Sequence, residues 1–356
     1  MIRIYEELDK LIAEGMACAL TTLVGASGSS PQNTGAKVIF LPDGRMIGTI
    51  GGGCLEAEAR RIGLECLRTG EPRLFDLRLD DDFGWDDGLI CGGRVTLFIN
   101  PRPERSAEAF RAALEAARRR QRAALCTTVK GCTEGLGRTE FVQPNLPGPL
   151  ATEAAAALEA GRERLVQAAD GSTLYVEPVL PRPTALIAGA GHVGKVLGQV
   201  LSLAGFEVVI VDDRALFANP ERLPFADRVE VADIPGFVRD YPIDTDTFVV
   251  IVTRGHRHDA QVLRECIHSP ARYIGMIGSR RKITVIYEQF LREGIASPDD
   301  LRRVHSPMGL TLGDREVGEI AVSIAAEMIA VRRDADLAAI RPMQYHPPCV
   351  RGQSGQ

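Results

Sequence analysis

The chain has 356 residues, 45% hydrophobic and 25% charged, which is long enough for two globular domains with separate cores. Its 42 lysines and arginines are dispersed among 47 acidic residues, and the formal net charge of -5 argues against nucleic acid as a partner. The first residues lack the features of a signal peptide, and no long apolar stretch is free of charge. We therefore expect a cytoplasmic protein without a membrane partner.

Residues 1–180 predict a mixed α/β domain. Apolar residues at helical spacing in residues 4–12 indicate a first helix that stops at Gly15, and a turn at residues 42–44 joins two strands into a hairpin. A helix is expected over residues 54–68. The remaining predicted elements of this domain are strands near residues 18–24, 73–79, 94–99, 123–129 and 173–178, and helices near residues 104–119 and 152–160.

A boundary between two domains is predicted at Leu180-Pro181-Arg182-Pro183, because two prolines in four residues disfavour both helix and internal strand. Residues 181–333 then alternate strands and helices in the manner of a parallel sheet. The chain is thus predicted to be an α/β protein in which a mixed α/β N-terminal domain precedes a Rossmann-like, doubly wound parallel-sheet domain. The proline-containing tail at residues 334–356 is expected to be mobile.

A glycine-rich loop, GAGHVG, follows the first strand of the second domain and opens a helix. Gly189, Gly191 and Gly194 then allow a tight turn, close approach of a pyrophosphate and close helix packing. Asp212 ends the next strand, where a carboxylate can accept a hydrogen bond from a ribose 2′-hydroxyl. NAD is one ligand that fits this pattern, and another phosphate-bearing ligand, or none, is the alternative.

His192 lies inside this loop, and Arg254, His256 and His258 follow a later strand. Both segments are expected at the same edge of the sheet, where they can contact an anion. If residues 256–258 are extended, the two histidines point to opposite faces and form a poor metal site. A capping or packing role is the alternative.

Ser279 and Arg280 begin a further helix that opens with three cations, in Ser279-Arg280-Arg281-Lys282. A free helix N-terminus with a hydroxyl group and basic side chains favours an anion. The alternative is a solvated first turn capped by Ser279.

The first domain contains a second glycine loop, Gly51-Gly52-Gly53, directly before a helix that starts near Cys54. Its backbone amides can form an anion nest, and the position of Cys54 favours a thiolate. Cys91 also lies among glycines, so the two thiols are candidates for binding a soft metal or transferring a persulfide, with core packing as the alternative. The eight cysteines contain no CxxC pair, so no disulfide framework or zinc knuckle is expected. A polar loop that includes Ser29, Ser30 and Gln32 lies between two strands and adds hydrogen-bond donors.

Six segments together resemble the XdhC/CoxI family of accessory proteins for molybdenum hydroxylases, over residues 15 to 333. They are GSSPQNTGAKVIFLPDGRMIGTIGGGCLEAE, CGGRVTLFINP, LIAGAGHVGKVL, VTRGHRHDAQVL, YIGMIGSRRK and GEIAVSIAAEMIA.

The resemblance implies a homodimeric chaperone without turnover of its own that binds molybdenum cofactor, as molybdopterin or its cytosine dinucleotide form. It further implies sulfuration of the cofactor with a cysteine desulfurase and delivery to a molybdenum hydroxylase apoenzyme resembling xanthine dehydrogenase. Our hypothesis is that the cofactor lies in the interdomain cleft, with its phosphate on a glycine loop and Cys54 or Cys91 near molybdenum. An NAD-dependent oxidoreductase and a nucleotide-sensing regulatory module are the alternative functions.

Overall fold

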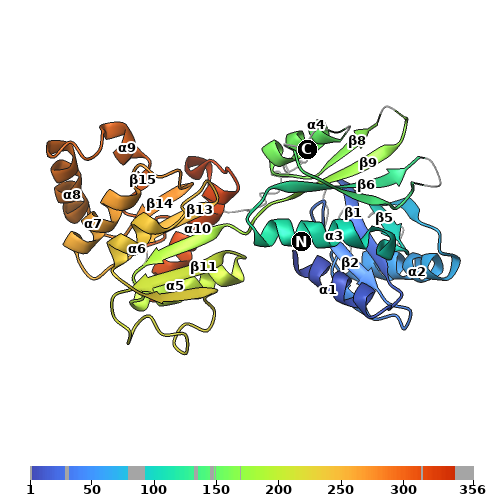
Figure 1. Cartoon of the computed structure of the whole chain (residues 1–356), viewed down its shortest axis with the longest axis horizontal. Coiled ribbons are helices and arrows are strands. Elements are labelled where there is room, and N and C mark those ends of the chain that lie inside the picture. The colour runs from blue at the N-terminus through green and yellow to red at the C-terminus, as the bar shows by residue number, and fades with distance from the viewer. Residues whose placement is uncertain are drawn as a thin grey trace, which may run out of the picture. The chain divides into compact units, whose positions relative to one another are not determined.

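The computed structural model describes residues 2–28, 32–78, 93–131, 135–144, 148, 150–168, 170–313 and 316–340. The chain divides into two compact units, Met1–Pro181 and Arg182–Gln356 (Figure 1). Three of the predicted site residues, Ser29, Ser30 and Cys91, lie outside the described residues, as does the tail from residue 341 onward.

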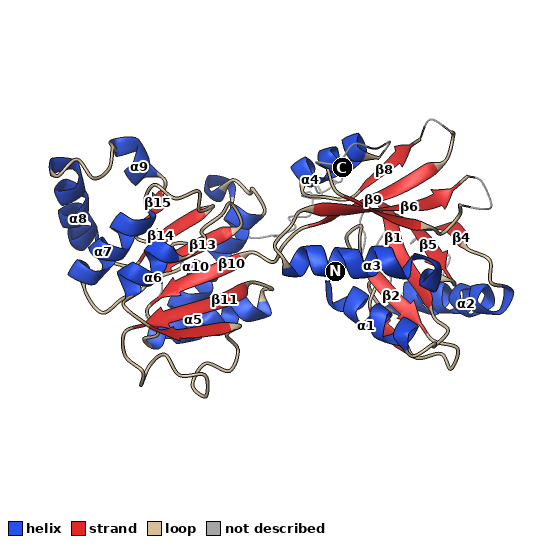
Figure 2. Ribbon diagram, viewed as in Figure 1, coloured by secondary structure: helices blue, strands red, loops and turns tan. Residues whose placement is uncertain are grey.

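The described residues of unit 1 form two antiparallel sheets. The first has the strand order β3-β2-β1-β5-β4, and the second has the order β7-β6-β9-β8 (Figure 2). The strands are β1 (Ala19–Ser27), β2 (Lys37–Phe40), β3 (Met46–Gly48), β4 (Arg73–Arg78), β5 (Arg94–Asn100), β6 (Ala123–Lys130), β7 (Thr139–Val142), β8 (Arg164–Gln167) and β9 (Thr173–Val179).

Four α-helices in the described part of unit 1 cover these sheets. Residues of α1 and α3 share one buried cluster with strands of both sheets, α2 packs on the first sheet, and α4 packs on the second. The predicted hairpin of residues 36–50 is confirmed as the antiparallel pair β2 and β3. The helices are α1 (Ile2–Ala13), α2 (Gly53–Thr69), α3 (Ala107–Arg118) and α4 (Ala151–Ala160), with a 3-10 turn η3 (Pro103–Ser106) before α3.

Unit 2 is built on one parallel sheet with the strand order β12-β11-β10-β13-β14-β15. In chain order within the unit this is 3-2-1-4-5-6, the order of a doubly wound dinucleotide-binding fold, so the predicted fold class is confirmed. The direction of winding changes between β10 and β13, and a ligand crevice is expected there. The strands are β10 (Thr184–Ala188), β11 (Glu207–Asp212), β12 (Arg228–Val231), β13 (Thr247–Ile251), β14 (Tyr273–Met276) and β15 (Val304–His305).

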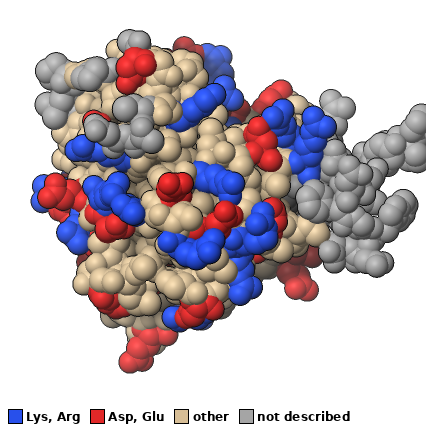
Figure 3. Space-filling model, turned by 90° about the vertical axis from the view of Figure 1, so that its right-hand side faces the viewer, with Lys and Arg blue, Asp and Glu red and all other residues tan. Residues whose placement is uncertain are grey.

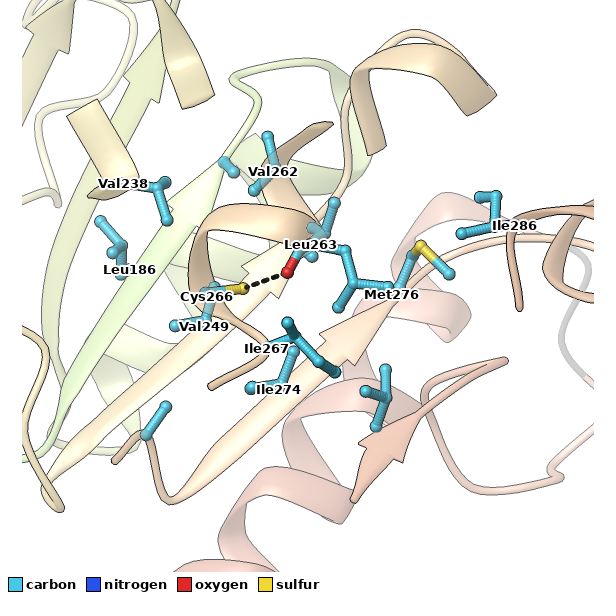
Figure 4. Close-up of a cluster of buried hydrophobic side chains, with 14 of the residues drawn as sticks. Leu186, Val238, Val249, Val262, Leu263, Cys266, Ile267, Ile274, Met276 and Ile286 are labelled. Carbon is cyan, nitrogen blue, oxygen red and sulfur yellow. Dashed lines mark hydrogen bonds between the residues drawn. The ribbon is translucent and has the colours of Figure 1, made fainter. Parts of the chain in front are cut away.

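Helices cover both faces of this sheet because its strands alternate their side chains between two buried clusters. Leu186 of β10 packs under α6, α7 and α8, whereas its neighbour Ile187 packs under α5 and α10. Figure 4 shows the first cluster, in which the Cys266 thiol lies 3.7 Å from the Leu263 carbonyl oxygen. Burial raises the pKa of Cys266 to about 12, so this thiol is a packing group. The helices are α5 (His192–Leu203), α6 (Ile234–Asp240), α7 (His256–Cys266), α8 (Arg280–Arg292), α9 (Pro298–Arg302) and α10 (Val317–Arg332), followed by a 3-10 turn η4 (Leu337–Ala339).

The charged side chains are mixed in sign on the face drawn in Figure 3, where lysines and arginines lie among aspartates and glutamates. Within the described ranges, no helix is both long and apolar enough to cross a bilayer.

Candidate functional site

The fingerprint loop of unit 2 connects β10 to α5, and two of its glycines are required by the fold. Gly189 has φ +119°, and a Cβ on it would lie 2.5 Å from the Val252 carbonyl oxygen. A Cβ on Gly194 would lie 2.0 Å from the Gly189 carbonyl oxygen. These two glycines therefore serve the turn and the close approach of helix to strand.

The third fingerprint glycine has a different environment. Gly191 adopts φ -65°, which any residue tolerates, and a Cβ on it would meet no protein atom within 4 Å. Gly255, which caps the N-terminus of α7, is likewise extended and has open space beside it. Because neither backbone nor packing requires glycine at these two positions, the space beside them is available to a ligand.

Two hollows open at these glycines and share Thr253 and Arg254. The smaller, of about 390 Å³, is lined by the N-terminus of α5, and the larger, of about 600 Å³, by the N-termini of α7 and α8. Three helix N-termini, each with a partial positive charge, thus meet this edge of the sheet. The smaller hollow is lined by Gly191, His192, Val193, Arg214, Phe217, Val252, Thr253, Arg254 and Ile277, and the larger by Thr253, Arg254, Gly255, His256, Ser279, Arg281, Lys282 and Val285.

The histidine pair does not have the extended geometry considered from the sequence. Helix α7 begins at His256, so His256 and His258 both lie in its first turn, and His256 lines the larger hollow. The cause is local: only four residues separate the end of β13 at Ile251 from the start of α7 at His256, and Gly255 is the N-cap of that helix. No group of three or more histidine, cysteine, aspartate or glutamate side chains suited to a metal ion occurs in the part of the chain that the structure describes.

The basic segment at the start of α8 contributes to the larger hollow through Arg281 and Lys282, whereas Arg280 is an exposed residue beside it. Ser279 caps the helix by accepting a hydrogen bond from the Lys282 amide at 3.4 Å. The Lys282 ammonium pairs with Asp259, whose carboxylate is completely buried and also accepts from Thr253. The sequence analysis missed this pair because its members lie 23 residues apart on different helices.

Asp212 lies at the end of β11, where the fingerprint predicts it, but its carboxylate is only 1% exposed. Oδ2 accepts from the Ala190 amide at 2.8 Å and from Arg214 Nη2 at 2.9 Å, and Oδ1 accepts from the amide and Nε of Arg214 at 3.0 and 2.8 Å. Burial alone would raise the pKa of Asp212, but the hydrogen bonds from Arg214 and Ala190 outweigh it and hold the pKa below its usual range. Asp212 is thus an ionised group satisfied by its own chain.

In unit 1, the polar loop and the second glycine loop meet at Lys37. The Lys37 ammonium donates to the Gly35 carbonyl at 3.2 Å, and the Lys37 carbonyl accepts from the Thr49 amide at 3.1 Å. Gln32 is half-buried in the polar loop. The two loops that the sequence analysis associated with a cofactor are therefore held side by side at one residue.

The glycine loop before α2 is closed by a carboxylate of its own helix. Gly51, Gly52 and Gly53 all have positive φ, of 122°, 77° and 60°. Glu56 accepts from the Thr49 hydroxyl at 2.6 Å and from the Ile50 amide at 3.0 Å. Partial burial would raise the pKa of Glu56, but the Thr49 hydroxyl and the amides of Ile50, Gly52 and Gly51 lower it. An anion that binds this nest must compete with Glu56.

Cys54 is the second residue of α2, and its partly exposed side chain lies beside this closed loop. The other described cysteines, Cys18, Cys66, Cys126 and Cys266, are buried. Cys54 is thus the most accessible cysteine among the described residues.

A buried ion pair lies behind the two loops of unit 1. Lys37 Nζ is 2.5 Å from Glu177 Oε1, and each side chain is only 3% exposed. Tyr5 donates to Glu177 Oε2 at 2.6 Å, and the Tyr175 hydroxyl has no hydrogen-bond partner among the described residues. These side chains line a cavity of about 10 Å³, which is about the space for one water molecule. No short sequence motif signals this cluster, because Lys37 and Glu177 are 140 residues apart.

The fold and the crevice together define a two-domain protein whose second domain is of the Rossmann type. Residues 185–328 match the XdhC Rossmann domain, and residues 11–78 match the XdhC and CoxI family. The chain belongs to the XdhC/CoxI family, as the resemblance in the sequence predicts.

Three curated relatives are each 25% identical to the chain. The matches cover 94% of the chain for YqeB of Escherichia coli, 92% for a probable xanthine dehydrogenase subunit of Bacillus subtilis, and 90% for the molybdenum cofactor insertion chaperone PaoD of E. coli. The chain spans 47% of YqeB, or about half its length, but 96% and 85% of the other two proteins.

A crystal structure described as a xanthine dehydrogenase from Bacillus halodurans is similar in fold. It has a TM-score of 0.77 and 23% sequence identity, and the match covers 94% of this chain and 97% of the other.

Proposed function

We propose that this chain is an accessory protein that binds molybdenum cofactor as cargo, supports its sulfuration and delivers it to a molybdenum hydroxylase apoenzyme of the xanthine dehydrogenase type. The observation that carries the proposal is the open space beside Gly191 and Gly255, at the N-termini of two helices. Molybdopterin has a terminal phosphate, and its cytosine dinucleotide form has a pyrophosphate. Either group suits the amides and cations of this edge.

The name of the relative PaoD, a molybdenum cofactor insertion chaperone, supports molybdenum cofactor as the cargo. The name of the B. subtilis relative, which describes a probable subunit of xanthine dehydrogenase, supports a hydroxylase of that type as the recipient. The cargo-binding residues proposed in unit 2 are Gly191, His192, Arg254, His256, Ser279 and Arg280, to which the structure adds Arg281 and Lys282 as lining groups. Of the other residues expected from the sequence, Gly189 and Gly194 shape the loop, and Asp212 contacts its own chain.

In unit 1 we assign the cargo to the loops around Lys37, with Cys54 or Cys91 near molybdenum. The partial exposure of Cys54 beside the closed glycine loop supports this assignment. Ser29, Ser30, Gln32, Gly51, Gly52 and Gly53 complete the proposed contacts. A cysteine desulfurase supplies the sulfur in this scheme, and the protein acts as a cytoplasmic homodimer.

The experiment is to purify the protein anaerobically from cells that make molybdenum cofactor, and to measure bound molybdenum and pterin. We expect both to copurify in equal amounts. Absence of both would refute the cargo. Addition of the loaded protein to hydroxylase apoenzyme then tests delivery, and light scattering and pull-down with a cysteine desulfurase test the assembly.

The thiol role has a separate test. The variant Cys54→Ala/Cys91→Ala should retain bound pterin but lose activation of the hydroxylase. Cys266→Ala, which removes a core thiol from unit 2, is the matched control and should activate normally. Full activation by the double variant would contradict a role for either thiol.

A further inference from the structure

The end of β11, where an NAD-binding fold contacts the ribose of its ligand, has a different arrangement in unit 2. A carboxylate at the end of the second strand normally accepts a hydrogen bond from the ribose 2′-hydroxyl. Four N–H groups already donate to Asp212, three from Arg214 and one from Ala190. Since a carboxylate has about four acceptor positions, Asp212 has none left for a ribose hydroxyl.

Arg214 presents a guanidinium group in place of that carboxylate. Its side chain lines the smaller hollow together with Gly191 and His192. Nε and Nη2 bind Asp212, so Nη1 takes no part in this pair and remains as a donor group. The group that faces a ligand at this position is therefore a guanidinium donor, and the carboxylate lies behind it.

The guanidinium group is held in place on a second side. Its central carbon lies 3.7 Å from the centroid of the Phe217 ring, and Arg222 lies over the same ring at 4.9 Å. Arg222 also donates to the Ala190 carbonyl at 2.7 Å, which ties this cluster to the fingerprint loop. An arginine fixed by a bidentate pair and by an aromatic ring is ordered before any ligand binds.

We propose that Arg214 sets the ligand specificity of unit 2, by withdrawing Asp212 from ribose recognition and selecting a phosphate ester at this position. A free 2′-hydroxyl finds no acceptor there, whereas a phosphate accepts hydrogen bonds from the guanidinium group. The other carboxylate nearby, Asp213, pairs with Arg254 at 2.7 Å and lies 3.7 Å from Arg214 Nε, so it is shared between the two arginines. The ligand class is a nucleotide that carries a phosphate on its ribose, in preference to NAD.

The experiment measures NAD and NADP binding to the full chain by calorimetry, with NADP as the probe that adds only a 2′-phosphate. We expect wild-type protein to bind NADP at least about tenfold more tightly than NAD. Arg214→Ala releases Asp212 and should reverse this order, so that NAD binds more tightly than NADP. Asp212→Asn in the Arg214→Ala background should remove the gain in NAD binding.

Two further variants keep the test decisive. Arg239→Ala is a control, because the Arg239 side chain is 61% exposed and pairs with Asp240. This variant should leave the ratio of NADP affinity to NAD affinity unchanged. Arg214→Lys preserves the charge but cannot form the bidentate pair, and it should lower the ratio even if Arg214→Ala fails to fold. Wild-type protein that binds both nucleotides equally, or binds neither, would overturn the proposal. An unchanged ratio in both Arg214 variants would also overturn it.

Protein for these measurements is produced in cells that cannot make molybdenum cofactor, so their outcome is independent of cofactor loading. Failure of the proposed chaperone function and failure of this inference are thus separate results.

Discussion

The two glycine loops of this protein both precede a helix but differ in what their polar groups contact. In unit 1, three successive glycines with positive φ close the loop on Glu56, a residue of the following helix. In unit 2, the carboxylate of Asp212 on the next strand accepts a hydrogen bond from the Ala190 amide. The space beside Gly191 stays open. A glycine before a helix is therefore insufficient to define an anion site, because a carboxylate of the same chain can satisfy the loop.

A buried ion pair accompanies each loop, and the two pairs differ in exposure. Lys37 and Glu177 are each 3% exposed, whereas Lys282 is 22% exposed and its partner Asp259 is fully buried. The first pair is enclosed by the core of unit 1, and the second reaches the larger hollow of unit 2. We therefore expect the first pair to affect mainly stability, and the second also to affect ligand binding.

The largest expected effect is that of Lys37→Met. It leaves the Glu177 charge buried without its partner and should lower the free energy of unfolding by about 3–5 kcal/mol. Urea denaturation measures the change. Lys37→Met/Glu177→Leu removes both charges and should recover most of the loss. Lys282→Met is the counterpart in unit 2 and should lose less stability, because solvent reaches its ammonium. If Lys37→Met lowered the free energy of unfolding by less than about 1 kcal/mol, the Lys37–Glu177 pair would behave as a surface ion pair, and the contrast with Lys282–Asp259 would be wrong.

The fingerprint glycines provide a matched pair of substitutions. Gly194→Ala places a methyl group against the Gly189 carbonyl and should cost about 1–3 kcal/mol. Gly191→Ala meets no protein atom and should stay within about 0.5 kcal/mol of wild type. Thermal unfolding tests both. The Gly191 variant should nevertheless bind phosphate-bearing ligands more weakly than wild type. If the two substitutions lowered the unfolding free energy equally, the space beside Gly191 would not be open.

The pair of Asp212 and Arg214 predicts a pH dependence. Because the pKa of Asp212 is lowered in the folded protein, its contribution to stability is present above the unfolded carboxyl pKa of about 4 and is lost as pH falls through the folded value. Removing Arg214 leaves burial as the main influence, which raises this pKa. The deficit of Arg214→Ala in unfolding free energy should thus be largest near pH 7 and shrink toward pH 3. A deficit that is constant with pH would argue against an ionised Asp212.

Among the charge substitutions, the smallest expected effect is that of Glu56→Gln, because this carboxylate is only partly buried. Loss of charged hydrogen bonds from Thr49 and the Ile50 amide should cost about 1 kcal/mol near neutral pH. The pKa of Glu56 is lowered, so the cost should decline in acid. Melting temperatures at several pH values measure it. Glu58→Gln, on the same helix but away from the loop amides, is the control.

Most secondary structure and the fold of unit 2 were predictable because they depend on local patterns. Buried strands alternating with helices, together with the spacing of Gly189, Gly191 and Gly194, predicted the parallel sheet. The histidine pair shows where local reasoning stopped. Whether His256 is extended or helical depends on how soon the chain turns after β13, and no residue between Arg254 and His258 signals that point except Gly255.

By itself the sequence determined the family, the Rossmann type of unit 2 and the places where glycine loops precede helices. Only the tertiary structure decided which groups those loops contact. Lys37 meets Glu177 through the packing of two sheets, and the folding of Arg214 back onto Asp212 neutralises that carboxylate and places a guanidinium group in front of it. The physical reason is that a charge or an amide binds whichever group the packed chain brings within hydrogen-bonding distance, and sequence spacing does not specify that group.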